Sequence, residues 1–216
     1  MTYLLSILIP TLLERQVKCS KLLMDIYDQI KRDNLEDLIE VISMNDNRTV
    51  KLSEKRNTMQ KLAQGKYFMH HDDDDTLALD FCKTVIDFIK NMKEEVDVIN
   101  IEQKAFIQSS PKLGSPLNIF VVKSDLRETF ELREIGSQVS DKNNEKVYKR
   151  FSWQWSLWNR NRFQHVMRSD IDKNACEDQN WLKRIQLEYP ETQAWINNHI
   201  LHEYHYEEGV AGSTCQ

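Results

Sequence analysis

Long apolar stretches are missing from this sequence. The longest apolar run, residues 4–9, is far shorter than the roughly 20 residues that a membrane-spanning helix needs. No basic segment precedes this run, as one would in a signal peptide. We therefore expect no membrane span, no secretion and a cytoplasmic location.

Cysteine and clustered positive charge are also scarce. The four cysteines lie far apart and form no Cys-x-x-Cys pair, which argues against a zinc site or a disulfide framework and predicts free thiols. They are Cys19, Cys82, Cys176 and Cys215. Acidic residues number 34 against 29 basic residues, for a formal charge of −5, and no Lys/Arg-rich tract offers a surface to a phosphate backbone. We expect no nucleic-acid partner.

Glycine-rich phosphate loops are absent as well. The sequence contains no Gly-x-Gly-x-x-Gly motif after its first apolar run and no Walker-type Gly-Lys-Ser/Thr anywhere. A nucleotide bound by this chain would therefore need its phosphates held in another way, for which a metal ion is the simplest choice.

The order of short apolar runs and helical patterns predicts the fold class. Of the 216 residues, 40% are hydrophobic, which is enough for one sizeable core. Apolar runs predict strands at 4–9, 38–44, 66–71 and 96–101, and amphipathic spacing predicts helices at 17–31, 53–64 and 76–92. This alternation is typical of an α/β fold with a mostly parallel sheet and helices on both faces.

The signal weakens after residue 101. Residues 117–122 are typical of a strand, and 179–187 and 191–201 of two helices separated by a proline. No repeat and no long linker divides the chain, so we expect a single domain over residues 1–216.

The strongest chemical feature is the acidic run Asp72 to Asp75, at the end of the third predicted strand. Mutual repulsion opposes folding of such a run unless a cation neutralises it, and hard oxygen ligands select Mg²⁺, Mn²⁺ or Ca²⁺. The alternative is a solvated helix start, where aspartate is favourable. Ligands of open parallel sheets, however, bind beyond the carboxyl ends of the strands, where this run lies.

Three further polar segments precede the acidic run. They are Thr11 to Arg15 after the first strand, Asn45-Asp46 after the second, and Arg56-Asn57 in the helix before the third. The first two would meet the acidic run at one edge of the sheet. Taken singly, loop Asp and Asn residues are mostly turn formers, and a helical arginine is mostly solvated.

Together these segments resemble the nucleotide-sugar-binding half of a GT-A glycosyltransferase of the family 2 type. The resemblance rests on Ser6-Ile7-Leu8-Ile9-Pro10-Thr11, Asn45-Asp46, Arg56-Asn57, Ala63-x-Gly65-Lys66-Tyr67 and Asp72-x-Asp74-Asp75. Residues 177–184 are similar to that family's Glu-Asp-x-x-Leu-x-x-Arg segment, so the resemblance covers roughly residues 4 to 187. The family's Asp-Gly-Ser is replaced by Asn45-Asp46-Asn47, and its apolar pair before the Asp-x-Asp motif by His70-His71.

The resemblance implies a GT-A type fold and a role for each matching residue. Residues 1–101 would form a nucleotide-sugar-binding half, and residues 102–216 an acceptor and catalytic half. The donor-binding candidates are Thr11, Glu14, Arg15, Asp46, Arg56, Asp72 and Asp73. The candidate ligands for Mn²⁺ or Mg²⁺ are Asp74, Asp72 and His205, because a C-terminal histidine closes the metal shell in some members. Asp178 is the candidate catalytic base.

These assignments have plainer alternatives. Asp178 could be an ordinary acidic residue at a helix N-terminus. His202 and His205 could share a helix face, or they could be two surface histidines. The tryptophans Trp153, Trp155 and Trp158 could stack on a sugar or form part of the core.

The short length, the His-His-Asp-Asp-Asp-Asp run and the tryptophan-rich stretch also resemble the glycosyltransferase domain encoded by chlorella viruses, which would place the protein in a host cytoplasm. The expected function is metal-dependent transfer of a hexose or deoxyhexose from a UDP-sugar to a glycan or glycoprotein hydroxyl, with inversion. Two alternatives remain open. One is a nucleotidyltransferase, which also uses paired carboxylates, and the other is a non-catalytic, metal-dependent sugar-binding module.

Overall fold

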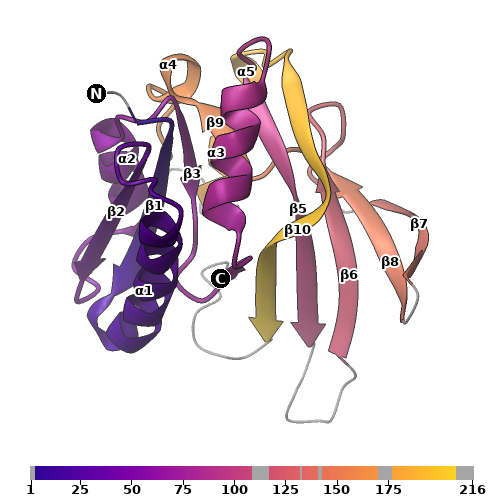
Figure 1. The fold of residues 1–216 in the computed structure, drawn as a ribbon, viewed down its shortest axis with the longest axis horizontal. Coiled ribbons are helices and arrows are strands. Elements are labelled where there is room, and N and C mark those ends of the chain that lie inside the picture. The colour runs from indigo at the N-terminus through magenta and orange to yellow at the C-terminus, as the bar shows by residue number, and fades with distance from the viewer. Residues whose placement is uncertain (1–2, 109–116, 132, 141–142, 170–176, 208–216) are drawn as a thin grey trace.

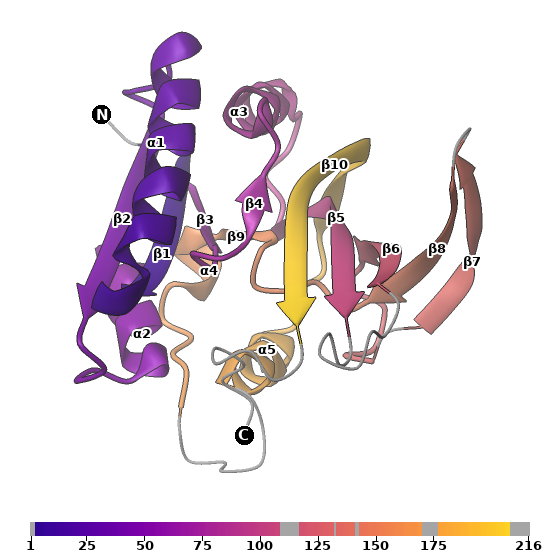
Figure 2. The same cartoon turned by 90° about the horizontal axis from the view of Figure 1, so that it is seen from below.

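The computed structural model describes residues 3–108, 117–131, 133–140, 143–169 and 177–207. One large mixed sheet runs through the molecule, with the strand order β2-β1-β3-β9-β5-β6-β8-β7, and β10 pairs with β5 and β4 (Figure 1). Helices α1 and α3 lie on one side of this sheet, and α2 and α5 lie on the other (Figure 2). The predicted α/β class with helices on both faces is confirmed.

The N-terminal elements follow the predicted alternation closely. They are β1 (Leu5–Leu12), the short 3₁₀ helix η1 (Leu13–Arg15), α1 (Gln16–Arg32), β2 (Ile39–Asp46), α2 (Leu52–Leu62), β3 (Tyr67–His70), β4 (Thr76–Leu77) and α3 (Phe81–Asn91). The predicted helix at 76–92 begins later than expected, because Thr76–Leu77 pair with β10 before the helix starts.

The C-terminal elements are mostly strands. They are β5 (Val98–Gln108), β6 (Leu117–Ser124), β7 (Arg133–Ser140), β8 (Asn143–Arg150), β9 (Leu157–Asn159), α4 (Arg160–Phe163), α5 (Glu177–Leu187) and β10 (Gln193–Glu207). β9 is antiparallel to β3 and β5, β6 is antiparallel to β5 but parallel to β8, and β7 is antiparallel to β8. The sheet is therefore parallel at its β2-β1-β3 end and mixed beyond it.

The parallel strands bring three of the polar segments to one edge of the sheet. β1 is buried almost throughout, as expected for a strand covered on both faces. It pairs in parallel with β2, Thr11 beside Asn45, and with β3, Leu8 beside His70. The Thr11 loop, the Asn45-Asp46 turn and the acidic run therefore leave the sheet together.

The predicted helix at residues 191–201 is wrong, because this segment is part of β10. β10 pairs in parallel with β5, but its register shifts between Ile196 and Ile200 and again before His202. Asn198 lies in the left-handed region, with φ 60°. These irregularities break the two-residue alternation of apolar and polar side chains that is typical of a strand. The apolar residues of 191–201 therefore have a spacing that suggested a helix.

The tryptophan-rich stretch at 153–158 belongs to the core. Trp158 is fully buried and packs against Trp181 of α5, with ring centroids 5.6 Å apart, and against Phe163 at 5.4 Å. All three tryptophans of this stretch are buried in the core, and Trp153 and Trp155 flank Gln154, which donates a hydrogen bond to Asp72.

The expectations for cysteines and membrane spans can be tested in part. Cys19 and Cys82 are buried free thiols, and Cys176 and Cys215 lie outside the described residues. No helix within the described ranges is long and apolar enough to cross a membrane. Residues 109–116 and 208–216 also fall outside these ranges.

Candidate functional site

Arg15 neutralises two members of the acidic run. Its Nη2 atom lies 2.6 Å from Asp73 Oδ1 and 2.6 Å from Asp74 Oδ2. Asp73 also accepts a hydrogen bond of 2.5 Å from Thr11 Oγ1, and burial raises the pKa of Asp73. The Asp73 side chain is 2% exposed, whereas that of Asp74 is 39% exposed. Asp74 is therefore the carboxylate of this pair that a ligand can reach.

Arg56 joins the acidic run to the segment that carries the candidate base. Its guanidinium donates to Asp72 Oδ1 and to Glu177 Oε1, although α2 and α5 are distant in sequence. Burial lowers the pKa of Arg56, but the charges of Asp72 and Glu177 outweigh this and raise it. The contact brings the first turn of α5 to the carboxyl end of β3.

A second buried arginine holds Glu177 from the other side. Arg168 Nε lies 2.8 Å from Glu177 Oε2, and its Nη1 lies 3.1 Å from His70 Nε2. Burial lowers the pKa of Arg168 to about 10, and burial also raises the pKa of Glu177. With one arginine on each side, Glu177 serves as a structural anchor.

Asp178 differs from its neighbour Glu177. It lies half-buried in the first turn of α5, and its Oδ1 accepts a hydrogen bond of 2.8 Å from the backbone N–H of Gln179. Its carboxylate forms no ion pair with any residue that the structure describes. Of the two acids that begin α5, Asp178 is thus the one available for chemistry.

A buried histidine pair covers the end of the acidic run. His202 of β10 lies 3.3 Å from Asp75 Oδ2 through Nε2, and its Nδ1 lies 2.9 Å from Gln103 Nε2. The ring of His71 packs edge-on against that of His202 at 5.1 Å. Burial lowers the pKa of His71 to about 3 and that of His202 to about 4, so both rings are neutral near pH 7.

The structure places His205 differently from its neighbour His202. The His205 side chain is 47% exposed, stacks on Phe106 at 4.7 Å, and lies 3.7 Å from Glu203. Because the segment is a strand, His202 and His205 do not share a face as they would on a helix. His202, which sequence reasoning did not select, is the C-terminal histidine whose side chain contacts the acidic run.

Asp46 and Glu14 organise the loops that flank the acidic run. Asp46 Oδ2 accepts hydrogen bonds of 2.5 Å and 2.7 Å from the backbone N–H groups of Thr49 and Val50, and its Oδ1 pairs with Lys55. Lys55 also donates to the carbonyl of Thr11 at 2.7 Å, which ties the β1 and β2 loops together. Glu14 pairs with Arg48 at the surface.

Acid should weaken the fold through Asp46. Its pKa is lowered to about 2, first by the hydrogen bond from Lys55 and then by those from the backbone. The unfolded chain therefore binds the proton more readily, and the stabilisation present above about pH 4 is lost as the pH falls towards 2. We expect Asp46→Asn to flatten the pH dependence of the free energy of unfolding in this window, measured by urea titration. Identical slopes for wild type and variant would contradict this role.

The carboxylate oxygens of the acidic run are suitable ligands for a hard cation, but their present arrangement does not leave room for one. Its carboxylates already face Arg56, Arg15 and His202. Among the residues described, no three His, Cys, Asp or Glu side chains are placed so that they could hold a metal ion. A cation held by Asp72 and Asp74 would need Arg15 to leave Asp74 first. The carboxylates are thus of the right kind for Mn²⁺ or Mg²⁺, but Arg15 takes the place beside Asp74 that the ion would need.

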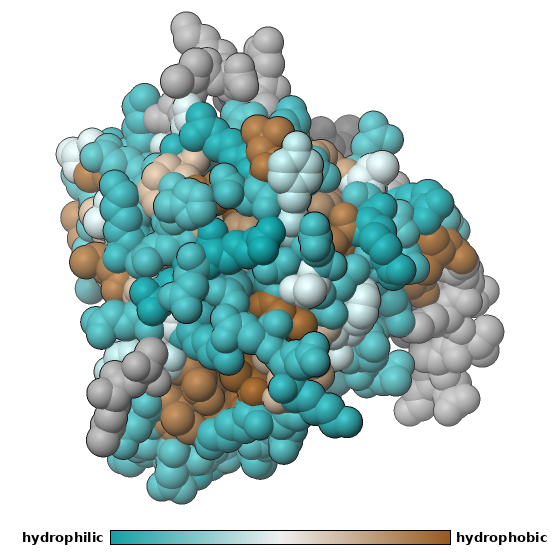
Figure 3. Space-filling model, turned by 90° about the horizontal axis from the view of Figure 1, so that it is seen from above, coloured by the Kyte–Doolittle hydropathy of each residue, from teal (hydrophilic) through white to brown (hydrophobic). Residues whose placement is uncertain are grey.

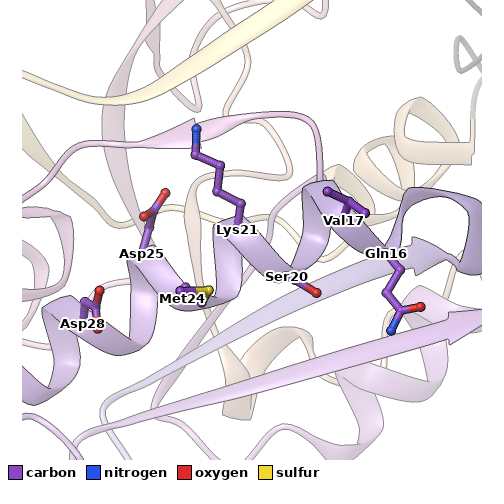
Figure 4. Close-up of a pocket in the computed structure, with 7 residues that line it drawn as sticks. All are labelled: Gln16, Val17, Ser20, Lys21, Met24, Asp25 and Asp28. Atoms are coloured by element: carbon purple, nitrogen blue, oxygen red, sulfur yellow. The ribbon is translucent and has the colours of Figure 1, made fainter.

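Two surface hollows lie away from these residues. One, of about 450 Å³, follows the exposed side of α1 between Gln16 and Asp28, and α1 alone lines it (Figure 4). The other lies among β5, β6 and β10 beside Trp195. Seen from above, the molecule is mostly hydrophilic, with apolar side chains in small separate patches (Figure 3). Neither hollow includes a candidate site residue.

Comparison with known proteins identifies the fold. No protein-family model and no curated protein sequence matches this chain. The structure of S. aureus TarS 1-349 in complex with UDP-GlcNAc matches with a TM-score of 0.55 and 16% identity, over 95% of this chain and 59% of that one. The catalytic domain of Drosophila β1,4-galactosyltransferase 7, in complex with xylobiose, matches with a TM-score of 0.50 and 13% identity, over 92% of this chain and 67% of that one.

This chain spans about three fifths of the TarS 1-349 chain, so the likeness concerns the shared part alone. At these identities it is a likeness of architecture, and it agrees with the resemblance found in the sequence. The chain therefore has the α/β fold of the GT-A glycosyltransferases, as predicted.

Proposed function

We propose that this protein is a glycosyltransferase that moves a hexose or deoxyhexose from a UDP-sugar to a hydroxyl of a glycan or glycoprotein, with inversion. The observation that carries the proposal is the Arg56 bridge between Asp72 and Glu177, which sets Asp178 beside the acidic run at the strand ends of a GT-A fold. The complexes of TarS with UDP-GlcNAc and with UDP support a uridine nucleotide as the donor moiety.

The donor would bind at the shared edge of β1, β2 and β3. Thr11, Asp73 and Arg15 meet there, and Asp46 fixes the neighbouring loop. The guanidinium of Arg15 is 25% exposed, so it can turn from the carboxylates towards diphosphate oxygens, for which it has matching geometry. Residues 1–101 would thus form the donor half of a single domain, and residues 102–216 the acceptor half.

Asp178 would act as the general base. Its carboxylate is not committed to an ion pair with a described residue, and its charge acts on the buried Arg56 and Arg168 and on Arg150. A carboxylate in this position can take the proton of an acceptor hydroxyl as that oxygen attacks the anomeric carbon from the face opposite UDP. The product then has the inverted anomeric configuration.

A UDP-release assay with a panel of UDP-sugars and simple glycan acceptors tests the proposal, with and without divalent metal. A glycosyltransferase releases UDP and joins the sugar to the acceptor. A nucleotidyltransferase would release pyrophosphate instead, and a sugar-binding module would bind glycan without releasing either. Failure to release UDP with any donor, together with no UDP binding, would overturn the proposal. The cytoplasmic location and the viral source stay predictions.

Divalent metal is expected to tighten UDP binding. Mn²⁺ or Mg²⁺ carries more charge than Arg15 and favours carboxylate and diphosphate oxygens, so we expect it to displace Arg15 from Asp74. By calorimetry, UDP should bind more tightly with Mn²⁺ than with EDTA, and Asp74→Asn should remove most of the difference. Asp87→Asn, which alters an exposed pair with Lys83 away from the site, is the matched control. Equal UDP affinity in Mn²⁺ and EDTA would show that Arg15 remains the counter-charge.

A further inference from the structure

Arg150, the last residue of β8, is a largely buried cation without a carboxylate partner. Its guanidinium lies 3.3 Å above the ring centroid of Trp153 and 5.7 Å from that of Trp155. Nη2 donates to the carbonyl of Phe130 at 3.4 Å, and no ion pair joins Arg150 to any residue within the described ranges. Its Nε is buried and finds no acceptor there. Because a desolvated charge is costly unless it is paired, this geometry favours an anion at Arg150.

Two neighbours on the same segment also have unused polar atoms. Gln154 Oε1 and Trp155 Nε1 are buried without a hydrogen-bond partner among the described residues, although both side chains are only 6% exposed. Folded proteins leave few such atoms unpaired, and functional sites are one place where they do. Gln154 Nε2 donates to Asp72 Oδ2 at 3.1 Å, so the segment reaches the acidic run.

The surroundings of Arg150 place it on the side of the candidate base. Arg150 lies in the half of the chain that we assign to the acceptor, and its guanidinium packs on Trp153. Burial lowers the pKa of Arg150 to about 10, and the negative charge of Asp178 opposes this shift. The donor candidates come from β1, β2, α2 and the acidic run, whereas Arg150 ends β8. Arg150 is thus associated with the residue that would face the acceptor.

We propose that Arg150, oriented by Trp153 and Trp155, binds an anionic group of the acceptor, a phosphate or a carboxylate carried near the hydroxyl that receives the sugar. The proposal rests on the proposed function, because Asp178 marks the acceptor side only if it is the base. A guanidinium fork pairs with either oxyanion through two hydrogen bonds. The indole faces hold the fork in one orientation, and Trp155 Nε1 supplies one more donor.

The test compares anion binding in wild type and Arg150→Gln. Each protein is saturated with UDP and titrated with inorganic phosphate, with glucuronate and with glucose, and tryptophan fluorescence is recorded, since two indoles adjoin the site. We expect the variant to bind phosphate, glucuronate or both at least about tenfold more weakly, as for loss of a charged hydrogen bond. The anion affected identifies the acceptor class, and glucose binding should be the same in both proteins.

UDP binding separates this inference from the proposed function. UDP affinity measured without added phosphate, glucuronate or glucose should agree within about twofold between wild type and Arg150→Gln. If Arg150→Gln also lost UDP affinity, Arg150 would bind the donor diphosphate. If Arg150→Gln bound the anions as tightly as the wild type, Arg150 would not bind the acceptor anion. Either result overturns the inference, while UDP release by the wild type tests the proposed function separately.

Two further variants guard against a folding artefact. Arg150→Lys keeps the charge but not the fork, so it should weaken anion binding less than Arg150→Gln does; equal affinity for Arg150→Lys and wild type would contradict bidentate pairing. Arg127→Gln is the matched control, because Arg127 also lies over an indole, that of Trp195 at 5.9 Å, but is exposed and paired with Asp125. It should leave all three titrations unchanged.

Discussion

Replacing Asp178 by asparagine is expected to lower the rate of sugar transfer by roughly 10² to 10⁴, the usual contribution of a positioned base. The amide has nearly the same shape as the carboxylate but cannot take the acceptor proton. UDP affinity should persist, because within the described residues no hydrogen bond or ion pair joins Asp178 to a donor candidate. Single-turnover transfer and calorimetric UDP binding, measured on the same preparation, separate chemistry from binding.

Glu177→Gln provides the comparison for this experiment. Glu177 lies between Arg56 and Arg168, so its replacement should lower stability more than it lowers the rate of the chemical step. If Asp178→Asn transferred sugar at nearly the wild-type rate while Glu177→Gln did not, the roles of the two acids would be reversed. A product with retained anomeric configuration would reject the single-displacement mechanism and leave the donor-site assignments standing.

Removing Arg56 should have the largest effect on stability. In Arg56→Met, Asp72 and Glu177 lose the cation that both share, and Glu177 is 15% exposed and cannot be solvated fully. Breaking a buried ion pair by removing one partner typically costs about 3–5 kcal/mol. We expect a loss of that size in the free energy of unfolding, measured by urea titration with circular dichroism.

A surface pair gives the matched control for Arg56. Arg32 forms an exposed pair with Asp33, and Arg32→Met should change the unfolding free energy by less than about 1 kcal/mol. The double variant Arg56→Met/Asp72→Asn should recover part of the loss, because Asp72 has no other ion-pair partner among the described residues, whereas Glu177 keeps Arg168. Equal losses for Arg56→Met and Arg32→Met would show that the bridge contributes little to the fold.

The sequence predicted the strands and helices of the N-terminal half well, because its periodicity is regular. Strands such as β1 are mostly apolar and almost fully buried, and helices such as α1 have one apolar face, so each element has a recognisable pattern. Parallel pairing then follows from the alternation of strands and helices, and it brings Thr11, Asp46 and the acidic run to one edge of the sheet. The location of the candidate site thus follows from local pattern and one topological rule.

The remainder of the candidate site depends on contacts between residues that are far apart in the chain, and such contacts produce no local sequence pattern. Arg168 and Arg150 matter through what lies beside them, a buried glutamate in one case and two indoles in the other. His202 was overlooked in favour of His205 because the bulges in β10 disguise its strand period. If residues 193–207 had been predicted as a strand, these two histidines would have been expected on opposite faces of it.

The Arg56 to Glu177 bridge also has a consequence for the order of folding. Its two residues are separated by 121 positions in the chain. Closing so long a loop is entropically costly, and domains rich in such distant contacts fold slowly. The parallel strands of the donor half can pair as soon as their own residues are available, whereas Asp178 reaches its place only when α5 docks. We therefore expect the proposed binding edge to form before the candidate base arrives, so that reactivity would be the last property that the folding chain acquires.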